Sequence, residues 1–197
     1  MKPTYQGFEE KNATSFIQLP PVGAYIAKIM AVRIKDAEPN FPRDTIEVMV
    51  EITEGEYAGR YTEVYNDQKE RLGTDKAKYK GIFRLVPPMD GDEDWRKRVF
   101  ERAMWCVAES NPGFHWDWDE KKLTGKMIGI NIRKRLYNYN GQDRETTEIG
   151  QFEVVQDVRD GKVKPMKPRE QRTQVVESVN NVPEGYTAVD TEKVPWD

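Results

Sequence analysis

The residues best suited to bind a ligand lie in one predicted strand in the second half of the chain. Ile128, Ile130 and Ile132 fall on one face of this strand, because side chains alternate at period two. The opposite face carries Asn131, Arg133, Arg135, Tyr137 and Tyr139. Arginines bind phosphates and tyrosines stack on bases, the two contacts that single-stranded nucleic acid offers whatever its sequence. We therefore predict a nucleic-acid-binding face on this strand.

The charge of the same segment supports this interpretation. No acidic residue occurs between Lys126 and Gly141, so we predict a positive local field. The basic side chains that we assign to the candidate nucleic-acid site are Arg33, Lys35, Lys126, Arg133, Lys134 and Arg135. The alternative is a solvated outer face with no ligand, because an exposed strand face is polar in any case.

Whole-chain totals limit where an anion could bind. The formal charge of the 197 residues is −3, which argues against a uniformly basic coat. Residues 174–197 contain five acids and one base, so this segment carries −4 and the remainder +1. Any anion-binding surface must therefore be local. The length suits one substantial domain with tails.

Several classes of function find little support in the sequence. One cysteine, Cys106, and one histidine, His115, exclude an intrachain disulfide and argue against a zinc site, so we expect no metal and no cofactor. A nuclease using carboxylates such as Glu47, Glu51 and Asp67 stays open, although they form no compact acidic motif. Because no apolar run reaches membrane-spanning length and no signal peptide is evident, we predict a soluble cytoplasmic protein without membrane partners.

A set of strands must position the candidate site. Asn140-Gly141 tolerates positive φ and predicts a tight hairpin turn, after which residues 147–155 return as a partner strand. Earlier strands are predicted at 23–35, 45–53 and 61–65. In the second of these the apolar residues alternate with Glu47 and Glu51, which we expect to face outward and to repel phosphates there.

A helical stretch is predicted between the third and fourth strands. Its first helix covers residues 74–85, capped by Thr74, and its second begins near Asp92 or Asp94 and ends at Ser110. The expected core face of the second helix consists of Trp95, Val99, Ala103, Cys106 and Val107. Trp116 and Trp118 are expected to close the end of the core, the alternative being a stacking site.

The predicted order of elements is three strands, helices, then two strands. This is the order of an OB-fold, a five-stranded Greek-key barrel with its helix between strands three and four. We therefore predict a mainly β protein with three parts: an N-terminal arm at residues 1–20, an OB-fold domain at 21–170 and a flexible acidic tail at 171–197. The loop between strands four and five of such barrels commonly helps to hold single-stranded nucleic acid.

Short motifs along residues 21–167 add a family resemblance. They are Gly23-Ala24-Tyr25, Glu54-Gly55-Glu56-Tyr57-Ala58-Gly59-Arg60, Lys80-Gly81, Asn111-Pro112-Gly113-Phe114-His115-Trp116-Asp117, Gly125-Lys126 and Thr146-Thr147-Glu148. Together they resemble small replication-associated proteins of phages and prophages of Gram-positive bacteria, thought to bind single-stranded DNA. The resemblance implies a DNA-maintenance role in a bacterial cytoplasm. Our leading hypothesis is a non-catalytic single-stranded-DNA-binding protein in DNA replication or recombination of a phage or mobile element.

The end of the chain is similar to the acidic tails of bacterial single-stranded-DNA-binding proteins, which recruit replication and repair enzymes. The matching residues are Asp190, Glu192, Pro195, Trp196 and Asp197. The tail departs from that pattern in having Lys193, Trp in place of Phe, and a residue after the aromatic one. The similarity implies protein partners in replication or recombination, the alternative being an arbitrary end. The alternative for the whole protein is an OB-fold adaptor that binds proteins and not DNA.

Overall fold

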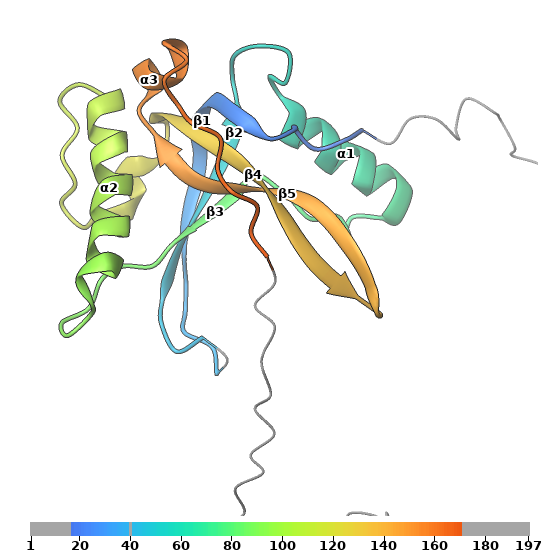
Figure 1. Ribbon diagram of the computed structural model, residues 1–197, viewed down its shortest axis with the longest axis horizontal. Helices are drawn as coiled ribbons and strands as arrows, with labels where there is room; N and C mark the ends of the chain where they lie inside the picture. Colours follow the sequence, from blue (N-terminus) through green and yellow to red (C-terminus); the bar gives the residue numbers. More distant parts are fainter. Residues whose placement is uncertain (1–16, 40, 171–197) are drawn as a thin grey trace, which may run out of the picture.

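A computed structural model describes residues 17–39 and 41–170 of the chain. At its centre is a five-stranded antiparallel sheet with the strand order β3-β2-β1-β4-β5 (Figure 1). The strands are β1 (Gly23–Lys35), β2 (Thr45–Ile52), β3 (Ile82–Leu85), β4 (Met127–Tyr139) and β5 (Gln142–Glu153). The protein is therefore mainly β, as the sequence predicts.

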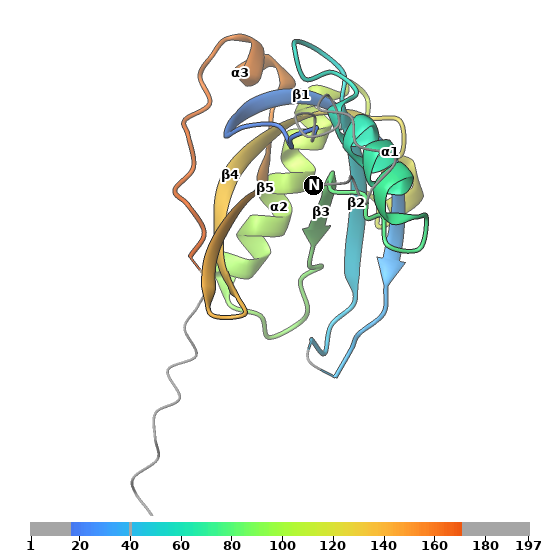
Figure 2. The same ribbon diagram turned by 90° about the vertical axis from the view of Figure 1, so that its right-hand side faces the viewer.

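The central strand β1 pairs with β4 through its first half and with β2 through its second half. Residues 23–28 pair with β4, whereas residues 27–35 pair with β2 across a register shift between Ile29 and Ala31. A bulge of this kind bends a strand, so the β1–β2 and β4–β5 hairpins leave the sheet in different directions (Figures 1 and 2). The edge strands β3 and β5 approach each other, with Phe83 and Phe152 ring centroids 4.6 Å apart, but the sheet does not close into a barrel.

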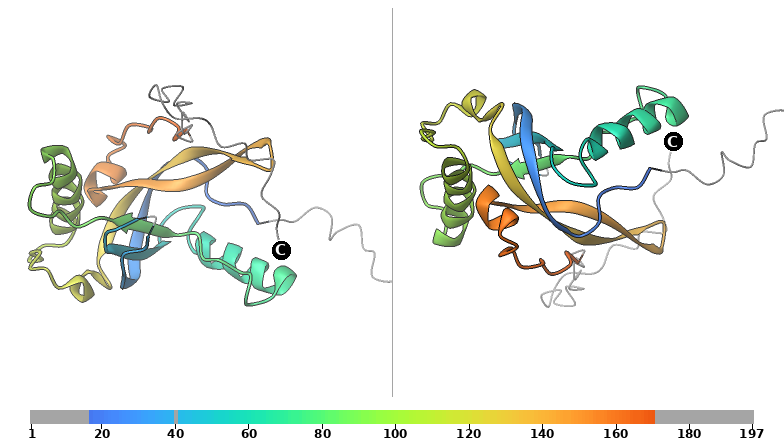
Figure 3. Two further views of the ribbon diagram at one scale, coloured as in Figure 1. Left: turned by 90° about the horizontal axis from the view of Figure 1, so that it is seen from below. Right: turned by 90° about the horizontal axis from the view of Figure 1, so that it is seen from above.

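The predicted β4–β5 hairpin is confirmed, although its second strand covers Gln142–Glu153 and not residues 147–155. Its turn contains Asn140 at φ 52° and Gly141 at φ 75°, the positive values that the Asn-Gly pair tolerates. Ile128, Ile130 and Ile132 are fully buried in the core. The hairpin extends well beyond the rest of the sheet, on the side opposite α2 (Figure 3).

The predicted strand at residues 61–65 is wrong, because these residues belong to α1 (Arg60–Leu72). The carboxylate of Glu51 accepts hydrogen bonds from the backbone N–H groups of Tyr61 and Thr62, at 3.1 and 2.7 Å. A helix leaves its first N–H groups unpaired and favours negative charge there, so Glu51 stabilises the helical start. Tyr61 and Val64, three residues apart, form the buried side of the helix.

The predicted helix at residues 74–85 is also wrong. α1 ends before Gly73, and residues 82–85 form β3, in which Phe83 pairs with Val48 of β2. A strand of four residues is too short to show a period in the sequence. β3 is extended because it pairs with β2. The residues from Thr74 onward carry no local signal for this pairing.

The helix α2 (Asp94–Ser110) has the predicted extent, although only part of its predicted core face is buried. Ala103, Cys106 and Val107 are buried together with Phe100 and Met104, whereas Trp95 and Val99 are exposed. Trp118 is exposed too and stacks on Phe100, with ring centroids 5.8 Å apart. A short 3-10 helix, η2 (Glu120–Leu123), and α3 (Val155–Arg159) complete the described elements. None of the described helices is long and apolar enough to cross a membrane.

Candidate nucleic-acid interface

Strand pairing places an acid opposite the first predicted arginine of β4. Arg133 lies opposite Glu148 of β5, and its Nε donates to Glu148 Oε1 over 3.0 Å. Arg135 comes within 3.9 Å of the other carboxylate oxygen of Glu148. Arg169, which follows α3 in sequence, reaches Glu148 Oε1 at 3.4 Å. We call these four residues the hairpin cluster.

Arg169 belongs to a connector, residues 160–170, that crosses the face of β4 and β5 on which Asn131 and Gly150 lie and reaches the free edge of β4 at Arg169. The backbone N–H of Arg169 donates to the Lys134 carbonyl, and the Leu136 N–H donates to the Arg169 carbonyl, both over 2.8 Å. Gly150 allows this approach, because a Cβ there would lie 2.5 Å from the Met166 sulfur. The sequence marks the connector as basic, but only the fold shows that Arg169 joins the face of Arg133.

The hairpin cluster borders a groove of about 580 Å³. The groove is lined by Arg133, Arg135, Leu136, Tyr137, Asn138, Arg169 and Glu170. Three guanidinium groups share the single carboxylate of Glu148, and each guanidinium carries five N–H donors. Donors therefore remain for a phosphate, with the Tyr137 ring beside them. The arrangement can hold an anion next to a stacked base.

The expected positive field of β4 is reduced by acids on its partner strand. Lys134 pairs with Glu145 at 3.0 Å, and Asn138 donates to Asp143 over 2.9 Å. Absence of acids within residues 126–141 is therefore a poor guide to local charge. Antiparallel pairing brings the residues of β5 opposite those of β4, whatever their separation in sequence.

Asn131 is a correction to the predicted site. Its side chain is buried, and its Nδ2 donates to the carbonyl of Lys164 over 3.0 Å and to Glu153 over 3.2 Å. The connector covers this part of β4, so Asn131 supports the fold and cannot reach a strand of nucleic acid. Tyr139 is exposed at the end of the hairpin, with the Arg144 guanidinium 5.3 Å from its ring centroid.

Arg33 belongs to a second group of charges on β1, β2 and β3. Glu47 of β2 accepts from Arg33 Nε at 2.8 Å and from Arg84 Nε at 2.8 Å. The carboxylate is only 4% exposed, whereas the Arg33 and Arg84 side chains are 73% and 61% exposed. We call these three residues the sheet cluster. The expectation that Glu47 faces outward and repels phosphates is wrong, since two arginines cover it.

The pKa of Glu47 reflects two opposing effects. Burial alone would raise this pKa, but the hydrogen bonds from Arg33 and Arg84 outweigh burial and hold the pKa below its ordinary value. Glu47 therefore stays ionised and fixes both guanidinium groups. The sequence does not point to Arg84, because it predicts a helix over residues 74–85 where the structure has β3. Lys35, at the end of β1, pairs with Glu38 at 2.9 Å.

The carboxylates considered for a metal-dependent nuclease do not form a metal site. Glu51, expected to face outward, is instead buried against α1 and accepts from Tyr79 Oη at 3.0 Å. Asp67 pairs with Arg71 within α1. Across the described part of the chain, no group of three or more Asp, Glu, His or Cys residues could hold a metal ion.

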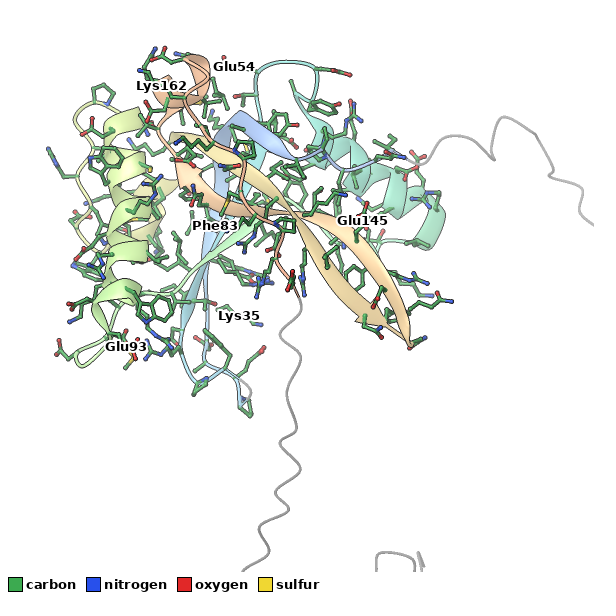
Figure 4. All side chains as sticks on the ribbon, viewed as in Figure 1. Lys35, Glu54, Phe83, Glu93, Glu145 and Lys162 are labelled. Atoms are coloured by element: carbon green, nitrogen blue, oxygen red, sulfur yellow. The ribbon has the colours of Figure 1, made fainter. Side chains whose placement is uncertain are left out.

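The two clusters lie on different surfaces of the molecule. In Figure 2 the connector lies beyond the β4–β5 hairpin, on the side away from β2 and β3. Since the connector contacts the face of Arg133, the hairpin cluster also points away from the sheet cluster. Figure 4 labels Lys35 on the β1–β2 hairpin and Glu145 on the β4–β5 hairpin and shows that these two hairpins lie apart. Lys126 lies apart from both, with its ammonium 5.2 Å from the Phe114 ring centroid.

Neither the models of known protein families nor the curated proteins include a match to this chain. Any inference about function therefore rests on the fold and the two clusters. The predicted tail residues lie outside the described residues; they are Asp190, Glu192, Pro195, Trp196 and Asp197.

Proposed function

We propose that this protein binds single-stranded DNA without catalysing a reaction, and that it serves DNA replication or recombination of a phage or mobile element in a bacterial cytoplasm. The observation that carries the proposal is the hairpin cluster. Arg133, Arg135 and Arg169 gather around one carboxylate beside Tyr137, in an open groove. Phosphates would bind the arginines while a base stacks on the tyrosine.

We propose further that the sheet is an open form of the OB-fold. Support comes from the strand order, in which β1 pairs with both β2 and β4 while β3 and β5 form the edges. The position of α2 between β3 and β4 also agrees with that class. The contact between Phe83 and Phe152 lies where the barrel of this class would close.

The proposed contacts do not depend on the base sequence of the DNA. Phosphate contacts and stacking leave base edges unread, so affinity should vary little between strands of different composition. Arg135 and Arg169 are the accessible phosphate ligands of the hairpin cluster, and Arg33 and Arg84 offer two more on the sheet cluster. The large share of electrostatics makes the affinity dependent on salt.

Titration with fluorescent oligothymidine over a series of salt concentrations tests the proposal. A DNA strand that wraps around the sheet and reaches both clusters would make about four phosphate contacts, so the slope of log affinity against log salt should be about −3, at roughly 0.7 per contact on single strands. Arg135→Ala should make the slope shallower by about 0.7. Arg159→Ala is the matched control, because the Arg159 and Arg135 side chains are 51% and 52% exposed and Arg159 lies on α3.

A slope near zero, or equal effects of the two variants, would overturn the proposal. Loss of the labelled oligonucleotide on addition of magnesium would indicate a nuclease instead. The second candidate function, a protein-interaction adaptor, is favoured by the exposed side chains of Trp95, Val99 and Trp118. Exposed apolar side chains that lie together commonly mark a protein-binding surface.

A further inference from the structure

A small pocket lies between β3 and the first half of α2; we call it the β3–α2 pocket. Its walls include the apolar side chains of Phe83, Leu85, Val99 and Phe100. Its volume is about 150 Å³. An apolar cavity of about this size accepts benzene in an engineered protein, so the pocket can accommodate one branched or aromatic side chain. Figure 4 labels Phe83 on β3 and Glu93 beside the first turn of α2, the two elements that border it.

At this pocket the edge of β3 carries no partner strand beside Arg84, although the preceding Phe83 contacts Phe152 of β5. The bond from Val50 N–H to the Gly81 carbonyl and the pairing of Val48 with Phe83 direct the odd-numbered backbone groups toward β2. The N–H and carbonyl of Arg84 therefore point away from β2. Among the described residues, no backbone hydrogen bond joins Arg84 to another element. An open edge of this kind is a template for an added strand.

The rim of the pocket carries three arginines. Arg43 donates two hydrogen bonds to Asp92, at 2.6 and 2.7 Å, and Arg84 is held by Glu47. The guanidinium of Arg96 lies 4.9 Å from the ring centroid of Trp95. Since the side chains of Asp92 and Glu47 are only 5% and 4% exposed, they hold Arg43 and Arg84 in place while further N–H groups of the arginines remain available. The rim is therefore suited to carboxylates.

We propose that the β3–α2 pocket binds an extended acidic segment of a partner protein. The segment adds to the edge of β3 at Arg84, places one apolar side chain between Phe83 and Val99, and sets its carboxylates against the rim arginines. Binding would cover Trp95 and Val99, both exposed on α2. This site is separate from the hairpin cluster, but it shares Arg84 with the sheet cluster, which the proposed function also offers to phosphates.

The composition of the pocket favours a peptide over a nucleotide base. A base would bury polar ring atoms against hydrocarbon walls, and an unpaired polar group carries an unfavourable transfer free energy. A nucleic-acid strand also makes no use of the free backbone groups of Arg84. A peptide satisfies the apolar walls, the strand edge and the cationic rim together.

Selection from a library of random heptapeptides tests the site. Peptides recovered on the full chain should carry an apolar residue flanked by Asp or Glu. A fluorescein-labelled member should bind Val99→Glu about tenfold or more weakly, because the new carboxylate blocks the pocket and repels acids. Methylation of the peptide nitrogen that faces Arg84 should weaken binding by about tenfold, since it removes a backbone donor.

Three further variants distinguish loss of the site from loss of the fold. Trp105→Ala is the matched control for Trp95→Ala, because both tryptophans lie on α2 and are 51% exposed; the Trp105 change should leave peptide affinity within about twofold. Arg96→Glu should favour a peptide in which lysines replace the acids, which a misfolded variant could not do. Selection of neutral or basic peptides, or equal recovery on Val99→Glu, would overturn the proposal. Displacement of the peptide by oligothymidine, with weaker oligothymidine binding by Val99→Glu, would assign the pocket to nucleic acid and also overturn it.

Discussion

The hairpin cluster and the sheet cluster use the same combination of groups, a carboxylate that binds several arginines. In the sheet cluster the carboxylate of Glu47 is buried and both arginines extend into solvent. In the hairpin cluster the side chains of Glu148 and Arg133 are mostly covered but keep some exposure, at 19% and 23%. In the sheet cluster a buried carboxylate therefore holds two exposed arginines. In the hairpin cluster the connector contributes Arg169 and covers part of the cluster.

The comparison indicates that a buried acid can hold arginines in fixed positions at the surface and need not repel an anion. Glu47 would repel a phosphate if it faced solvent, but once buried it holds Arg33 and Arg84 in place. The partners of Glu47 are 14 and 37 residues away in sequence. Glu148 lies 15 residues from Arg133, its partner across the hairpin. The hairpin cluster is thus mostly local, and the sheet cluster depends on three strands.

The largest expected effect comes from Ile130→Ala, which tests whether both clusters belong to one cooperative sheet. Ile130 is fully buried and pairs with Tyr25 of β1 and Phe152 of β5. Truncating such a residue leaves a cavity and should lower the free energy of unfolding by about 2–5 kcal/mol. Urea unfolding should show a single transition by tryptophan fluorescence and by circular dichroism. Two separate transitions would mean that the hairpin folds apart from the sheet.

Tyr137→Ala distinguishes the two clusters as binding sites. If a base stacks on Tyr137, this change should weaken oligothymidine binding by about 1–3 kcal/mol. Tyr137→Phe keeps the ring and should bind nearly as the parent does. Fluorescence anisotropy measures both affinities. Normal binding by both Tyr137→Ala and Arg135→Ala would remove the hairpin cluster as the DNA site and leave the sheet cluster as the candidate.

A pair of carboxylate deletions compares the clusters directly. Glu47→Ala should lower the free energy of unfolding by about 1–2 kcal/mol, because charged hydrogen bonds are lost but the arginines stay hydrated. Glu148→Ala should lower it by about 0.5–1 kcal/mol, since this carboxylate is more open. It should also tighten oligothymidine binding by freeing three guanidinium groups. Chemical denaturation measures the loss of unfolding free energy in both variants. A larger loss for Glu148→Ala than for Glu47→Ala would contradict the comparison.

The smallest effect concerns acid stability. The pKa of Glu47 is lower in the folded protein than in the unfolded chain, so the unfolded chain binds more protons at acid pH. The contribution of Glu47 is therefore complete above its unfolded pKa of about 4.3 and is lost as pH falls through the folded value. Between about pH 5 and pH 3 the parent should lose more stability than Glu47→Ala. Parallel loss in both proteins would show that the arginines do not stabilise the charged form.

The sequence by itself determined the elements whose signals are local. Alternation at period two placed β1, β2 and the fully buried isoleucines of β4, and Asn140-Gly141 gave the turn of the hairpin. The extent of α2 followed in the same way from helical periodicity and the breaker after Ser110. The arginines and tyrosines of the β4 face were also readable, since alternation assigns a face to each residue of a strand.

The tertiary structure alone decided what each of these residues contacts. The burial of Glu47 under two arginines depends on pairing among three strands, and the position of Glu51 depends on where α1 begins. β3 is a strand because β2 offers it an edge, and Arg169 joins the hairpin cluster because the chain returns along β4. Periodicity reports only which way a side chain points. Pairing across long separations sets its neighbours, and neighbours decide whether a charge is exposed, buried or part of a site.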